Sequence, residues 1–69
     1  MIKTKTIQHR SDYASDFDKE LGEWMALLIP NKALTNWKLA GDARFLMAVI
    51  VYDSDKLPEG AVTEKGKLA

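Results

Sequence analysis

The chain has 69 residues, with ten basic and ten acidic side chains, one histidine and no cysteine. A single core of this size supplies only a few kcal/mol of stability unless disulfides, metal or oligomerisation help. The composition excludes disulfides and Cys/His metal sites, so it favours oligomerisation. The net charge of zero argues against a dedicated nucleic-acid binder, which normally carries a basic excess.

No stretch of the chain approaches the roughly 20 apolar residues that a membrane helix needs, and the N-terminal residues lack the apolar segment of a signal peptide. The absence of cysteine agrees with a reducing compartment. We therefore expect a cytoplasmic protein that has no membrane partner and no cofactor.

The first predicted element is a strand over residues 2–8, where Thr, Ile and Lys mix in a pattern that suits one solvated face. Lys3 and Lys5 point to the same side because side chains alternate along a strand. Charged side chains of this kind discourage unwanted pairing, so we expect an edge strand.

An amphipathic helix follows, and Ser11 or Asp12 is the expected N-cap. Apolar side chains then recur at helical spacing and form one stripe: Tyr13, Phe17, Leu21, Trp24, Met25 and Leu28. Pro30 ends the helix at or near Ile29, because the residue before a proline is pushed out of the α region.

Two further strands are predicted over residues 34–39 and 44–52, joined by a two-residue turn at Gly41 and Asp42. That turn places Trp37 opposite Leu46, and Asn36 opposite Met47. The expected fold is α+β with the order β-α-β-β, in which one helix covers one face of a three-stranded sheet. Residues 1–53 form this single domain, and residues 54–69 form an irregular or partly disordered tail that Leu57 and Val62 can anchor.

The last predicted strand is apolar on both faces. We assign one face, together with the preceding strand, to the core under the helix: Trp37, Leu39, Leu46, Ala48 and Ile50. The other face is the predicted oligomer interface: Phe45, Met47, Val49 and Val51. Burying four such side chains contributes several kcal/mol at about 25 cal/mol per Å². The alternative is that the C-terminal tail folds back over this face.

Catalytic patterns are scarce. A Ser-His-Asp set drawn from Ser11, His9 and Asp12 requires three near-neighbours at a strand-to-helix junction to meet, and helix capping explains the serine and aspartate better. The carboxylate pair Asp16 and Glu20 suits a solvated helix face, and the glycines form no phosphate-binding loop. We therefore expect a protein that is not an enzyme and holds no metal.

Basic residues suggest one more specific hypothesis. Those expected to form a cationic surface are Lys3, Lys5, His9, Arg10, Lys38 and Arg44. Arg10 directly precedes the helix, where free backbone N–H groups favour an anion. Trp24 or Trp37 near a subunit boundary adds a stacking surface, which together with charge suits a nucleotide-like ligand. The alternative is that both tryptophans belong to the core.

The order of strand, acidic helix, strand and apolar strand, with the ending Phe45 to Tyr52, resembles the Cse60-like sporulation protein family and related uncharacterised bacterial and phage proteins. The likeness covers about residues 1–53, whereas the two tryptophans and the long tail have no counterpart in it. It implies a βαββ fold and carries over no functional residue.

The leading expectation is a non-enzymatic, homo-oligomeric small binding protein. Its concrete form is a phage-type, anti-defence protein that sequesters an anionic, nucleotide-like signalling molecule at a subunit interface with Arg10, Arg44 and a tryptophan. The alternative is a small protein–protein adaptor or inhibitor, in which the acidic helix face meets a basic partner through Asp16, Lys19 and Glu23. A general nucleic-acid binder is a third and weaker reading.

Overall fold

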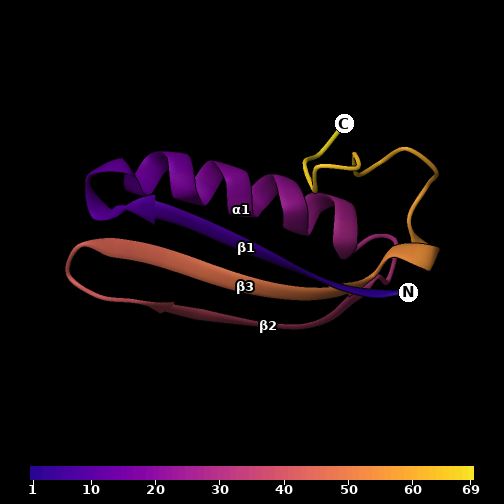
Figure 1. Cartoon of the computed structure of the whole chain (residues 1–69), viewed down its shortest axis with the longest axis horizontal. Helices are drawn as coiled ribbons and strands as arrows, with labels where there is room; N and C mark the ends of the chain where they lie inside the picture. Colours follow the sequence, from indigo (N-terminus) through magenta and orange to yellow (C-terminus); the bar gives the residue numbers. More distant parts are fainter.

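A three-stranded antiparallel sheet with one helix across it makes up the computed structural model, which describes all 69 residues (Figure 1). Its elements are β1 (Ile2–Arg10), the 3-10 turn η1 (Ser11–Tyr13), α1 (Ala14–Leu28), β2 (Leu34–Gly41), β3 (Phe45–Asp53) and the 3-10 turn η2 (Ser54–Lys56). The strand order is β1-β3-β2, so the last strand is central and the other two are edges. The predicted α+β class, the β-α-β-β order and the edge position of the first strand are confirmed.

The helix buries one apolar stripe, as its spacing predicts. Phe17, Trp24 and Leu28 are buried, and the helix ends where the N–H of Ile29 donates to the carbonyl of Met25, just before Pro30. Tyr13 was assigned to this stripe, but it lies in η1 and is 54% exposed. The stripe therefore begins one turn later than its sequence spacing suggests.

The predicted N-cap is wrong. Neither η1 nor α1 has a side-chain cap at its start. The Ser11 hydroxyl instead donates to the carbonyl of Ala43 at 3.1 Å, and the Asp12 carboxylate faces Arg10 at 3.7 Å. A tertiary contact to the turn between β2 and β3 has replaced the local one.

The core lies between α1 and the sheet. Helix side chains meet buried residues of β1 and β3: Ile7, Ala48, Ile50 and Tyr52. The Trp24 and Tyr52 rings pack with their centroids 5.6 Å apart, and burial raises the pKa of the Tyr52 phenol. Since α1 packs on β1 and β3, the helix-side surface of β2 is left largely uncovered.

The predicted hairpin register is wrong by four residues. Trp37 lies opposite Ile50 rather than Leu46, and Asn36 lies opposite Val51 rather than Met47. The turn is longer than predicted because the Asp42 carboxylate accepts bonds from the N–H groups of Arg44 and Phe45, which keeps Arg44 outside the strand. An even shift preserves which residues share a face, so the predicted division of β3 into two faces holds.

Placing Trp37 and Leu39 under the helix is also wrong. Both lie on the helix side of β2, but Trp37 is 46% exposed and Leu39 is 60% exposed. One helix of this width covers two of the three strands, and β2 is the strand it misses.

The C-terminal tail crosses the helix side of the molecule (Figure 1). Leu57 and Val62 pack against the core as predicted, and Leu68 joins them. Val62 and Leu68 form an antiparallel bridge, supported by a bond from the N–H of Thr63 to the carbonyl of Lys67. The tail therefore does not cover the face that carries Met47, and that alternative is excluded.

Candidate anion-binding site

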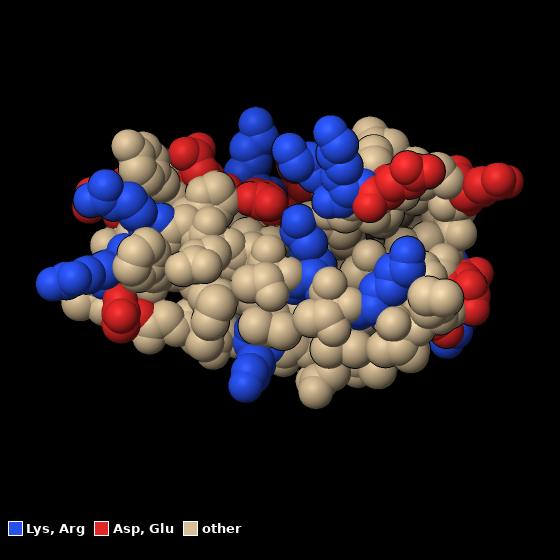
Figure 2. Space-filling view, viewed as in Figure 1, with Lys and Arg blue, Asp and Glu red and all other residues tan.

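A hollow of about 420 Å³ lies at the end of the sheet, between the junction of β1 with the helix and the turn between β2 and β3. Its lining residues are Arg10, Ser11, Asp12, Ala43 and Arg44. We call it the arginine hollow. Basic side chains project at this end of the molecule (left in Figure 2).

Two hydrogen bonds tie the walls of the arginine hollow together. The N–H of Ser11 donates to the carbonyl of Arg44 at 2.8 Å, and the Ser11 hydroxyl donates to the carbonyl of Ala43 at 3.1 Å. Arg10 and Arg44 are distant in sequence, and these bonds hold their backbones beside one another. Folding therefore brings together the two arginines that the sequence proposed as ligand-binding residues.

The two guanidinium groups are only weakly engaged within the chain. Arg10 faces Asp12 at 3.7 Å, with both side chains at least 70% exposed, an arrangement worth little in water. Arg44 has no carboxylate within ion-pair distance. Both arginines keep donors available for an external anion.

An aromatic ring adjoins this site. Phe45 is the cross-strand partner of Arg10, so the two side chains leave the same face of the sheet. Phe45 is 40% exposed. Phe45 is not among the residues predicted to bind a ligand, because its place in the apolar row of β3 predicts only an oligomer interface.

Phe45 is the first residue of a row on the sheet face that is turned away from the helix. We call this face the open sheet face. Its central row is Phe45, Met47, Val49 and Val51. Thr4, Thr6 and Gln8 of β1 flank this row on one side, and Asn36, Lys38 and Ala40 of β2 flank it on the other. Lys38 lies beside the middle of this row, Arg10 lies beside Phe45 at its end, and no element of the chain packs over the row.

The other predicted ligand residues lie elsewhere. Trp24 is 2% exposed and belongs to the core, whereas Trp37 lies on the helix side of β2, away from the open sheet face. Lys38 stands beside Val49, which is four residues from Phe45 along β3. Neither tryptophan reaches the arginines.

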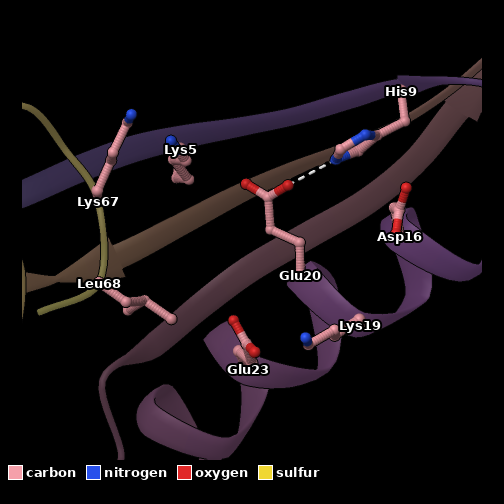
Figure 3. A pocket seen from close by; sticks show the side chains of 8 residues that line it. All are labelled: Lys5, His9, Asp16, Lys19, Glu20, Glu23, Lys67 and Leu68. Carbon is pink, nitrogen blue, oxygen red and sulfur yellow. Dashed lines mark hydrogen bonds and ion pairs between the residues drawn. The ribbon is translucent and has the colours of Figure 1, made fainter.

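His9 lies in a second hollow of about 440 Å³, between β1, α1 and the tail (Figure 3). Its Nε2 is 2.6 Å from a carboxylate oxygen of Glu20, and its ring meets that of Phe17 edge-on. Lys5 lies over the Trp24 ring at 5.6 Å. Since these groups already engage one another, we assign the second hollow to packing between β1 and α1.

No metal centre or catalytic triad is assembled. No group of three His, Asp or Glu side chains converges on a point. Ser11 bonds to Ala43, Asp12 faces Arg10, and His9 pairs with Glu20, so the three residues weighed as a triad have separate partners.

Comparison with known proteins finds no matching family model, no matching curated protein and no matching solved structure. The resemblance to the sporulation family therefore stays a prediction. No helix in the chain is both long and apolar enough to cross a membrane.

Proposed function

We propose that this chain is a non-enzymatic, homo-oligomeric binding protein that holds a small anionic, nucleotide-like molecule in the arginine hollow. One observation carries the proposal: two weakly engaged arginines meet at a hollow that borders an uncovered apolar sheet face. A ligand bound there lies at the rim of the surface through which copies of the chain associate.

The chemistry of the hollow suits a phosphate group. Guanidinium groups present paired N–H donors that match two phosphate oxygens, and two guanidinium groups offset a doubly charged phosphate. Phe45 takes the stacking role first given to a tryptophan. Stacking on an aromatic side chain contributes about 1–3 kcal/mol per base. Charge and stacking together favour a nucleotide over a simple anion.

The surface area of the chain supports self-association. Only 8 of the 69 residues are buried, and the accessible surface is 4974 Å². A compact monomer of 7.8 kDa is expected to expose roughly 4,400 Å². The difference, about 570 Å², is smaller than the area of about 800 Å² that each partner buries in a standard interface. Packing two open sheet faces together removes part of this excess.

A sequestering role fits these features. Sequestration requires affinity and no chemical step, and the arginine hollow offers charge and stacking without an acid–base pair. The proposal therefore keeps the phage-type, anti-defence role, in which a cytoplasmic nucleotide signal is held out of circulation.

Isothermal titration calorimetry with ATP and with inorganic phosphate tests the proposal. We expect the double variant Arg10→Ala, Arg44→Ala to lose at least tenfold in affinity for both probes. Lys19→Ala with Lys65→Ala removes the same charge from exposed sites elsewhere and is expected to bind as the unmodified chain does. Phe45→Ala is expected to weaken ATP binding and spare phosphate. Equal binding by the double variant and its control contradicts the proposal, as does the absence of binding by the unmodified chain.

A further inference from the structure

The two edges of the sheet differ in how they are protected. β1 carries four basic or titratable side chains, Lys3, Lys5, His9 and Arg10, whereas β2 carries one charge, Lys38. Charged residues on an edge strand discourage pairing with another sheet, and a long apolar edge invites it. The outer edge of β2 is therefore the one suited to receive a further strand.

The backbone of β2 has groups available for that strand. The N–H of Asp42 donates to the carbonyl of Phe45, and bonding alternates along an antiparallel pair. Lys38 and Ala40 consequently bond to β3, while Trp37 and Leu39 direct their N–H and C=O groups outward. The N–H of Trp37 is met only by the Asn36 side chain at 2.8 Å, as expected where no neighbouring strand accepts it.

Side chains beside this edge are apolar and exposed. Trp37 is 46% exposed and Leu39 is 60% exposed, on the helix side but beyond the reach of α1. In Figure 1, β2 lies at the margin of the molecule with no element beyond it. No strand of the chain pairs with this edge, and the helix does not cover its apolar side chains.

We propose that β2 pairs in antiparallel fashion with β2 of a second copy of the chain, around a two-fold axis at Leu39. In this register Leu39 meets the same residue of the second copy, and Trp37 lies opposite Gly41, which has no side chain to obstruct the indole. Lys38 lies opposite Ala40. An axis at Lys38 is disfavoured because it sets two ammonium groups against each other.

A second copy suits this edge because the edge is self-complementary. The straight part of β2 begins with the large residues Trp37 and Lys38 and ends with the small residues Ala40 and Gly41, so an antiparallel copy centred on Leu39 sets each large residue against a small one. The strand is irregular only at its start, between Leu34 and Asn36. A two-fold axis at Leu39 uses this straight part alone.

Pairing of this kind joins two sheets into one of six strands, with their open sheet faces side by side. Two such sheets packed through the open sheet faces give an assembly of four chains with two kinds of interface. The edge interface does not depend on anion binding.

Cross-linking through an introduced cysteine tests the edge interface directly, because the chain has no cysteine of its own. Under mild oxidation, Leu39→Cys is expected to form a disulfide-linked dimer in most molecules. Lys3→Cys, an exposed position on the other edge, is the control and is expected to remain mostly monomeric on a non-reducing gel. Equal cross-linking at both positions, or none at Leu39→Cys, overturns the inference.

Light scattering separates this inference from the proposed function. Leu39→Lys is expected to halve the mass of the assembly, and circular dichroism is expected to show an intact fold because residue 39 is exposed. If the open sheet faces do not associate, the unmodified chain is a dimer and Leu39→Lys makes it a monomer. An unchanged mass for Leu39→Lys overturns the edge pairing, as does mass spectrometry that finds a different polypeptide bound at β2.

Discussion

The two faces of β3 are built from the same kinds of side chain and have different surroundings. Ala48, Ile50 and Tyr52 are at most 3% exposed beneath the helix, whereas the alternating residues Met47 and Val49 are only half-buried. A row of apolar residues in the sequence thus shows that one face of a strand must be buried, but it does not show which element buries it. For one face the cover is α1, and for the other no part of this chain is placed to act as cover.

The largest expected effect comes from the two tryptophans, which lie on the same side of the sheet with different cover. Trp24→Ala leaves a large cavity in the core and is expected to lower the free energy of unfolding by about 3–5 kcal/mol. Trp37→Ala is expected to change it by less than about 1 kcal/mol in dilute, dissociated protein, because the side chain is half-exposed. Urea unfolding followed by circular dichroism measures both. Comparable losses contradict the placement of Trp37 outside the core.

A pair of glycines tests the geometry of the turn between β2 and β3. Gly41 has a φ of 140°, and an added Cβ lies 2.4 Å from the Phe45 carbonyl oxygen, so Gly41→Ala is expected to cost about 1–3 kcal/mol of stability. Gly22, inside α1, has open space around it. Gly22→Ala is expected to stabilise the chain by about 0.5–1 kcal/mol. Thermal unfolding gives both values, and a neutral Gly41→Ala refutes the turn geometry.

The smallest expected effect concerns acid and base stability at the far end of β3. A hydrogen bond from the Met1 amino group lowers the pKa of Asp53 below its ordinary 3.8, and bonds to Asp55 and Asp53 raise the pKa of that amino group above 8.0. The stability that Asp53 contributes is fully present above pH 3.8 and is lost as the pH falls through the lower pKa of the folded state. The stability that the Met1 amino group contributes is fully present below pH 8.0 and is lost as the pH rises through the higher pKa of the folded state.

We therefore expect the melting temperatures of the unmodified chain and Asp53→Asn, measured from pH 2 to pH 10, to differ most between pH 3.8 and pH 8.0. They are expected to converge at the acidic end. A difference that stays constant down to pH 2 contradicts this assignment.

The spacing of apolar residues in the sequence is enough to predict the helix, the three strands and the two faces of β3. The hairpin register could not be predicted from the sequence, because the hydrogen bonds that the Asp42 carboxylate accepts depend on how the turn closes and not on residue spacing. The sequence pattern placed Trp37 under the helix because alternation identifies a side of the sheet but not the width that one helix covers. The charge pattern predicts that Arg10 and Arg44 lie close together. The role of Ser11 in holding their backbones side by side depends on a tertiary contact, which residue spacing does not show.

The mass of the protein in solution, measured by light scattering on a size-exclusion column, tests most directly the claim that the open sheet face is an interface. The unmodified chain is expected to form an oligomer, and Met47→Asp is expected to lower its mass while secondary structure is retained. Thr63→Asp adds the same charge to the exposed tail and is expected to leave the mass unchanged. A monomeric unmodified chain, or an equal mass for the unmodified chain and Met47→Asp, contradicts the account.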